Sequence, residues 1–330
     1  MSIKTDLLEL DAKNKEEYSD ANINMSKQIV FEENNIFPEK QGLSSEISLP
    51  LFFQSLDNMK SVNEKILFSK NNIFYLFNNQ ILTKCLQKCL INVSKDIITF
   101  IIDELKGSFR EVIKNKNGNY FFSNLIKVCD KNSRLRILKE LSSTLNEDCI
   151  DKFATFPIQN LIQYASTEDE FQLLLSSFNE YEAILIPSIN PHGNFVIQKL
   201  IIHIPEDVRI KFNTILVKFV SLLARDTYGS FVLQKFISYT KSEEIQKEVL
   251  DSILNDFIKI STNKNGNFLI QNLLIKWWRN KKGENIKKMI KSKYQILCNN
   301  IYSVHICKLY DKLKNSEENK SDSPFNISKI

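Results

Sequence analysis

Seven short stretches of the sequence repeat the same pattern of polar and aromatic residues, which we call the triplet. Its members stand at i, i+1 and i+4: a small polar residue, usually an aromatic residue, and usually glutamine. Amide side chains offer both a donor and an acceptor to a base edge, and aromatic rings hold unpaired bases by stacking. The pattern therefore favours a surface for single-stranded nucleic acid. In chain order the triplets are Thr83, Lys84, Gln87; Asn119, Tyr120, Ser123; Thr155, Phe156, Gln159; Asn194, Phe195, Gln198; Ser230, Phe231, Gln234; Asn267, Phe268, Gln271; and Ser303, Val304, Cys307.

The glycines mark the period of this repeat, because four of only seven glycines directly precede a triplet. Gly118, Gly193, Gly229 and Gly266 are separated by 75, 36 and 37 residues, and Ala154 takes the same position inside the long interval. Steps of 36 residues in either direction reach Leu82 and Tyr302. The sequence thus predicts seven units, and a further step back reaches Glu46, where the pattern fails.

The apolar residues within each unit predict a helix with one buried stripe, since they recur at i, i+1, i+4 and i+5. Examples are Val196, Ile197, Leu200 and Ile201. Further amphipathic stretches lie between these helices. No stretch of useful length alternates apolar and polar residues with the period of two that a β-strand would show. We therefore expect an all-α solenoid of stacked units of about 36 residues. Because the apolar stripe is already occupied, all three triplet members are expected to face outward.

Composition supports a folded domain and suggests a polyanionic partner. The chain is 43% hydrophobic and 25% charged, which is typical of a soluble globular protein. Residues 1–45 hold nine acids against five lysines, a net charge of −4. Since the whole chain carries +5, the net charge of the remaining residues is +9. We expect residues 1–45 and a polar tail at 314–330 to be poorly ordered. The six cysteines lack paired CxxC spacing and no secretory leader is evident, which favours an intracellular protein with reduced thiols.

The phrases G-N-F-V-I-Q-K-L, G-S-F-V-L-Q-K-F and G-N-F-L-I-Q-N-L resemble the signature of Pumilio (PUF) repeats. This resemblance implies a right-handed crescent of about seven to eight three-helix repeats, here over residues 46–313 with a degenerate first unit or cap. It also implies that the concave face binds single-stranded RNA, one base per repeat, with the strand antiparallel to the protein. The first and last triplet members would then contact base edges, and the middle member would stack between bases.

Carried over to single units, the resemblance implies a uracil-leaning specificity. Two pairs resemble the pair with which the family binds uracil: Asn194 with Gln198, and Asn267 with Gln271. Asn119 resembles the first residue of such a pair, but Ser123 replaces the glutamine expected as the second. The Thr83 triplet vaguely resembles an adenine reader, while those of Thr155 and Ser230 do not map to a base. The expected site is 5′-?-U-n-U-n-U-(A?)-3′. No triplet ends in an acid, so strict recognition of UGU elements, which uses a carboxylate to read guanine, is not expected.

These features predict a cytoplasmic protein that binds messenger RNA in post-transcriptional regulation, such as translation repression. The alternatives are a nuclear or nucleolar ribosome-assembly factor that binds ribosomal RNA, and a HEAT- or armadillo-like scaffold that binds protein. We expect a monomer without enzymatic activity, cofactor, metal or membrane segment, whose convex face could bind protein co-regulators. Cys85 and Cys89 are interpreted as buried structural thiols, and the basic stretch 276–293 as a solvated turn and helix or as a phosphate contact.

Overall fold

The computed structural model describes residues 69–91 and 93–321. Contacts divide the chain into residues 1–57 and 58–330, and every described residue belongs to the second unit. The expected acidic segment 1–45, residues 46–68 of the expected repeat domain, and residues 322–330 of the expected tail therefore lie outside the described residues. None of the helices in the described ranges is both long and apolar enough to span a membrane.

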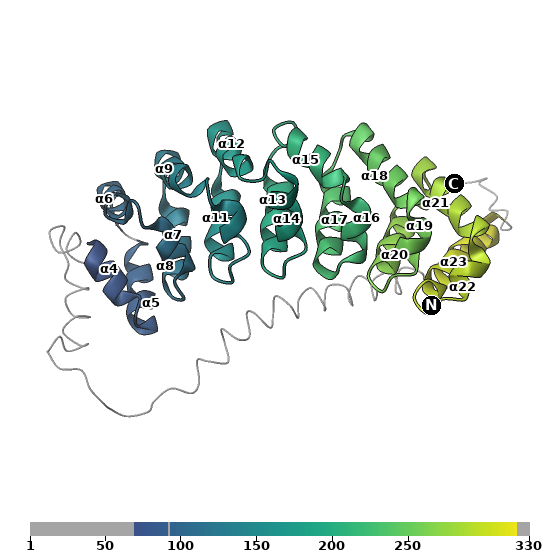
Figure 1. Cartoon of the computed structure of the whole chain (residues 1–330), viewed down its shortest axis with the longest axis horizontal. Helices are drawn as coiled ribbons and strands as arrows, with labels where there is room; N and C mark the ends of the chain where they lie inside the picture. Colours follow the sequence, from purple (N-terminus) through teal and green to yellow (C-terminus); the bar gives the residue numbers. More distant parts are fainter. Residues whose placement is uncertain (1–68, 92, 322–330) are drawn as a thin grey trace, which may run out of the picture. The chain divides into compact units, whose positions relative to one another are not determined.

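All regular elements of the described residues are helices, and they stack in sequence as three-helix units (Figure 1). The predicted α-solenoid is thus confirmed. The first helices of the units are α6 (Lys95–Leu105), α9 (Lys131–Leu141), α12 (Glu168–Ser176), α15 (Ile210–Val217), α18 (Glu243–Asn255) and α21 (Lys281–Ser292). The short middle helices are α7 (Phe109–Lys114), α10 (Leu145–Asp148), α13 (Tyr181–Ser188), α16 (Val220–Arg225), α19 (Phe257–Ser261) and α22 (Tyr294–Cys298).

The third helices carry the triplets and lie side by side along the stack (Figure 1). They are α8 (Gly118–Val128), α11 (Thr155–Tyr164), α14 (Gly193–His203), α17 (Thr227–Tyr239), α20 (Gly266–Trp277) and α23 (Val304–Ser321). Ahead of them, α4 (Lys70–Leu76) and α5 (Gln80–Cys89) pack together and supply the triplet helix of the first unit. Helix α23 continues past residue 313, where we expected the repeat domain to end.

The predicted apolar stripes form the core between neighbouring units. Val196, Ile197, Leu200 and Ile201 of α14 are buried, and the corresponding residues of α17 and α20 are buried as well. Each unit exposes this face until a neighbour covers it, so stacking supplies the hydrophobic stabilisation of the array. Trp277 and Trp278 at the end of α20 are also buried.

Glycine at the start of a third helix allows a close approach to the middle helix of the same unit. A Cβ atom on Gly266 would stand 2.3 Å from the carbonyl oxygen of Ile260, six residues earlier. The corresponding position in the α11 unit is Ala154, and the residue six positions earlier there is Asp148 instead of an apolar residue. The repeated glycines therefore reflect packing between two helices of one unit.

Each triplet helix begins after an asparagine or aspartate whose side chain accepts hydrogen bonds from the backbone of the first turn. The Asn115 Oδ1, for example, accepts from the N–H groups of Asn117 at 2.9 Å and Gly118 at 2.8 Å. Such caps satisfy N–H groups that lack a partner at a helix start. They also establish the register of every unit: the caps are Asn79, Asn115, Asp151, Asn190, Asp226, Asn263 and Asn300.

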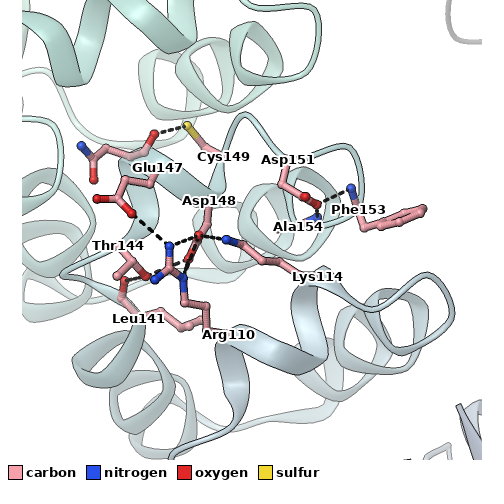
Figure 2. Close-up of polar contacts among 11 residues, drawn as sticks. Arg110, Lys114, Leu141, Thr144, Glu147, Asp148, Cys149, Asp151, Phe153 and Ala154 are labelled. Carbon is pink, nitrogen blue, oxygen red and sulfur yellow. Dashed lines mark hydrogen bonds and ion pairs between the residues drawn. The ribbon is translucent and has the colours of Figure 1, made fainter.

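Charged side chains join the first two complete units at their middle helices. The Asp148 carboxylate on α10 is fully buried and lies between Arg110 and Lys114 of α7 (Figure 2). The Arg110 Nε lies 3.0 Å from both Asp148 oxygens, and the Lys114 Nζ lies 2.6 Å from Oδ1. Thr144 donates to Asp148 Oδ2 at 2.7 Å. The carboxylate is thus surrounded by donors, as a buried charge requires.

A second ionic contact joins the first helices α9 and α12. Arg134 donates through Nε to Glu170 Oε1 at 2.8 Å, and through Nη1 to the carbonyl oxygen of Cys129 at 2.8 Å. The other carboxylate oxygen, Oε2, accepts from the backbone N–H groups of Ser166 at 2.9 Å and Thr167 at 3.0 Å. Glu170 also completes a capping box with Thr167 at the start of α12. One buried carboxylate therefore both caps its own helix and holds the preceding unit.

Candidate nucleic-acid interface

The first member of each of the six upstream triplets is buried, and so is Gln198 in the last position, so the expectation that all three members face outward is wrong for the first position and for Gln198. A short polar side chain in the first helical turn lies close to the carbonyl groups of the preceding turn and bonds to them. The Asn194 Nδ2, for instance, donates to the carbonyl oxygens of Asn190 at 2.8 Å and Pro191 at 3.0 Å. The buried first members are Thr83, Asn119, Thr155, Asn194, Ser230 and Asn267.

In two units the buried asparagine positions the glutamine one turn later. The Gln198 Nε2 donates to Asn194 Oδ1 at 2.9 Å, and the Gln271 Nε2 donates to Asn267 Oδ1 at 2.9 Å. Each asparagine thus has its amide nitrogen and oxygen both engaged. Each glutamine amide keeps its oxygen and its second N–H for another partner.

The α8 unit lacks this arrangement, because Ser123 stands where the other two asparagine units have glutamine. Asn119 still donates through Nδ2 to the carbonyl oxygens of Asn115 at 2.9 Å and Lys116 at 2.7 Å. Its Oδ1 atom, however, is buried without a hydrogen-bond partner, and so is the Ser123 hydroxyl. Unpaired buried polar atoms are uncommon in folded proteins and cost about 1–3 kcal/mol each.

The remaining triplets hold their hydroxyl groups and glutamines differently. The Thr155 Oγ1 donates to the carbonyl oxygen of His192 in the next unit at 3.1 Å and accepts from Gln159 Nε2 at 3.3 Å. The Ser230 Oγ donates to the carbonyl oxygen of Thr227 at 2.9 Å, and the Thr83 Oγ1 donates to that of Asn79 at 2.9 Å. Hydroxyl groups at this position therefore donate to backbone carbonyl groups, those of Ser230 and Thr83 within the same unit and that of Thr155 in the next unit.

Two glutamines are held from the next unit by residues that the sequence analysis missed. Asn124 donates through Nδ2 to Gln87 Oε1 at 3.0 Å, and Asn272 donates to Gln234 Oε1 at 3.3 Å. Both asparagines immediately follow the last triplet position. The sequence did carry a signal, since a polar residue follows the last member of each of the six upstream triplets: Lys88, Asn124, Asn160, Lys199, Lys235 and Asn272.

The middle members of the triplets are the most accessible. Tyr120 is 45% exposed and Phe268 57% exposed, Lys84 is also exposed, and Phe156, Phe195 and Phe231 are half-buried. Single exposed rings are ordinary, but a row of them on neighbouring helices is typical of a surface that contacts a partner. Between α8 and α11 they border a cavity of about 240 Å³ lined by Tyr120, Ser123, Phe156, Gln159, Asn160, Gln163 and Lys199.

In the last unit the predicted register is wrong by one residue. Asn300 caps the N–H groups of Tyr302 and Ser303, which places Ser303 at the glycine position and makes Val304, His305 and Lys308 the triplet. Ser303 and Cys307 are buried, whereas His305 and Lys308 are exposed. The error arose because this unit follows the previous one by 37 residues and has no glycine to mark its start.

Within the described residues no cluster of side chains could hold a metal ion. Lys199 donates to Gln163 Oε1 at 2.9 Å, and burial lowers the pKa of its amino group. The pKa of His203 on the same helix is lowered by burial and by the nearby Lys199. Cys85 and Cys89 are half-buried on α5 rather than buried as expected.

Comparison with known proteins agrees with this geometry. A family model described as the Pumilio-family RNA binding repeat matches residues 85–106, 108–142, 188–211, 220–254 and 256–276. Pumilio homolog 12 of Arabidopsis thaliana is 25% identical over 224 residues, covering 66% of this chain and 37% of that protein. Fem-3 mRNA-binding factor 1 of Caenorhabditis elegans is 24% identical over 274 residues, covering 73% and 42%. The chain thus spans less than half the length of these two relatives.

Solved structures share the same fold. The RNA-binding domain of yeast Puf5p bound to AAT2 RNA superposes with a TM-score of 0.67 at 19% identity, covering 76% of this chain and 72% of that one. A Puf4 mutant bound to a Cox17 RNA 3′ UTR recognition sequence gives a TM-score of 0.69 at 18% identity, covering 84% and 90%. The repeated triplets, the stacked three-helix units and these matches lead to one conclusion: the chain belongs to the Pumilio (PUF) family of RNA-binding repeat proteins.

Proposed function

We propose that this protein binds single-stranded RNA selectively along the row of third helices, one base per unit, with a preference for uracil at two positions. The observation that carries the proposal is the alignment of accessible rings and positioned glutamine amides on neighbouring third helices. The rings supply stacking, worth about 1–3 kcal/mol per base. The amides supply contacts to base edges in a fixed order along the strand.

The uracil preference is inferred from the Asn–Gln pairs. After Gln198 Nε2 has donated one hydrogen to Asn194 Oδ1, the glutamine still offers Oε1 and one N–H. Uracil presents an N3–H donor beside a carbonyl acceptor, which complements this edge, and its single ring leaves room for the long glutamine side chain. The same reasoning applies to Gln271 with Asn267.

We further propose that the bound RNA is messenger RNA and that the protein regulates it after transcription in the cytoplasm. This is supported by relatives named for messenger-RNA binding, such as Fem-3 mRNA-binding factor 1. Crosslinking the protein to cellular RNA and sequencing the bound fragments tests this step. Enrichment of messenger-RNA fragments is the expected result, whereas enrichment of ribosomal RNA would assign the protein to ribosome assembly instead.

Binding itself is tested by fluorescence anisotropy with U-rich, UGUA-containing and scrambled single strands. We expect the U-rich strand to bind more tightly than the scrambled one. Gln198→Ala combined with Gln271→Ala should weaken binding at least about tenfold, because each substitution removes a base contact. The matched control is Gln172→Ala, which alters an exposed glutamine on the first helix α12 and should leave the affinity unchanged. Absence of binding by the parent protein would refute the proposal.

A further inference from the structure

The reading position between α8 and α11 contains open space. Tyr120 and Ser123 of α8 and Phe156 and Gln159 of α11 line the cavity of about 240 Å³ described above. Both stacking residues and both edge residues of adjacent units therefore border one hollow. In the Asn–Gln units, a long glutamine occupies the position that Ser123 holds here.

The polar atoms at this position are also incomplete. Asn119 is 1% exposed, and both hydrogens of its amide nitrogen are directed to backbone carbonyl groups. Its Oδ1 is therefore available only as an acceptor, and it has no partner. The Ser123 hydroxyl, one turn later on the same helix, is likewise unpaired and can donate or accept. The two units with Gln198 and Gln271 satisfy the equivalent asparagine oxygen internally.

We propose that this position selects a purine, in contrast to the uracil expected there from the resemblance of Asn119 alone. The inference rests on the proposed RNA-binding function. Serine ends two bonds closer to the helix than glutamine, a difference of roughly 2.5 Å from ordinary bond lengths. A pyrimidine held between the rings falls short of Ser123 by about that distance, whereas the second ring of a purine extends the base toward it.

The hydrogen-bonding pattern is consistent with this size argument. Purines present a donor beside an acceptor on the Watson–Crick edge: the N6 amino group and N1 of adenine, or N1–H and O6 of guanine. The Ser123 hydroxyl belongs to a residue that lines the hollow, and after rotation about the Cα–Cβ bond it donates to the acceptor on this edge. The Asn119 oxygen is buried and Asn119 does not line the hollow, so purine binding gives a partner to the Ser123 hydroxyl, and this adds to stacking on Tyr120 and Phe156.

The test uses the full chain and four fluorescein-labelled strands, 5′-A-U-A-U-A-X-A-3′, in which X is A, G, C or U. The sixth nucleotide faces the α8 unit when the strand runs antiparallel to the protein. We expect strands with A or G to bind at least about fivefold more tightly than those with U or C. Ser123→Gln recreates an Asn–Gln pair and should shift the preference at X to U. Gln198→Ala, which alters the unit facing the fourth nucleotide, should weaken binding of all four strands and leave the preference at X unaltered.

The outcomes separate this inference from the function on which it rests. If none of the strands binds and U-rich RNA also fails to bind, the proposed function is wrong. If the strands bind but the parent protein prefers U or C at X, or shows no preference, the purine inference alone is refuted. Should Ser123→Gln fail to fold, Ser123→Ala provides the second variant. It retains the space and removes the hydroxyl, so we expect weaker binding overall with the purine preference kept; loss of that preference would contradict the size argument.

Discussion

Replacement of Glu170 tests whether adjacent units are held together by their first helices. The carboxylate is fully buried and accepts from Arg134 and from the backbone N–H groups of Ser166 and Thr167. Glu170→Ala removes all of these contacts and leaves Arg134, which is 8% exposed, without its counter-charge. The variant thus creates a buried unpaired guanidinium group and removes one half of the capping box, while the Thr167 Oγ1 still accepts from the backbone N–H of residue 170.

The magnitude follows from the contacts that remain. Removing one partner of a buried ion pair costs about 3–5 kcal/mol, and loss of the Glu170 half of the capping box costs at most about 1 kcal/mol. Arg134 keeps hydrogen bonds to the carbonyl oxygen of Cys129 and to the Ser166 hydroxyl, which places the ion-pair loss at the lower end. We therefore expect the free energy of unfolding to fall by about 3–4 kcal/mol.

The assay is equilibrium urea unfolding of the full chain, followed by far-UV circular dichroism. Glu147→Ala is the matched control, because Glu147 also pairs with an arginine but is 65% exposed. It should cost at most about 1 kcal/mol. A loss for Glu170→Ala below about 1 kcal/mol, or equal to that of the control, would refute the reasoning.

The same carboxylate predicts a pH dependence. Burial by itself raises the pKa of Glu170, but hydrogen bonds from Arg134, Ser166 and Thr167 outweigh it, so the pKa lies below its usual value. A lowered folded-state pKa adds stability that is present above the unfolded-state value of about 4.3 and is lost as the pH falls through the folded-state value. The difference in unfolding free energy between the parent and Glu170→Gln should therefore shrink below about pH 4. A constant difference between pH 7 and pH 3 would contradict this assignment.

Three further changes probe the packing of the units. Gly266→Ala places a Cβ against the Ile260 carbonyl oxygen at 2.3 Å and should lower the free energy of unfolding by about 1–3 kcal/mol, measured by urea unfolding; a neutral result would mean that the two helices separate readily. Asp148→Ala removes the carboxylate bound by Arg110 (Figure 2) and should cost about 1–3 kcal/mol; an unchanged urea midpoint would show that this cluster is not stabilising. Burial raises the pKa of Cys129 to about 12, so alkylation at pH 8 monitored by mass spectrometry should leave this thiol unmodified until urea unfolds the chain, and rapid labelling of the folded protein would contradict its burial.

The fold was predictable from the sequence because its determinants are local and repeated. A stripe such as Val196, Ile197, Leu200 and Ile201 can be buried only on one face of a helix, and its recurrence about every 36 residues requires neighbours that stack. The aromatic and glutamine positions were found for the same reason. The last unit was placed one residue early because it has no glycine and follows at 37 residues, and the shift from Ser303 to Val304 is defined by the cap from Asn300.

The hydrogen bonds and the space between units were decided by the tertiary structure alone. By contrast, the difference between Asn119 and Asn194 is local, because Gln198 one turn later pairs with Asn194 whereas Ser123 leaves the Asn119 oxygen unpaired. Residue type states what a side chain can donate or accept, but its partners depend on how closely the backbone of its own turn and of the next unit approaches. The buried Asp148, the bond from Asn124 to Gln87 and the cavity beside Ser123 all arise from such approaches between residues more than thirty positions apart, which periodicity within one unit does not encode.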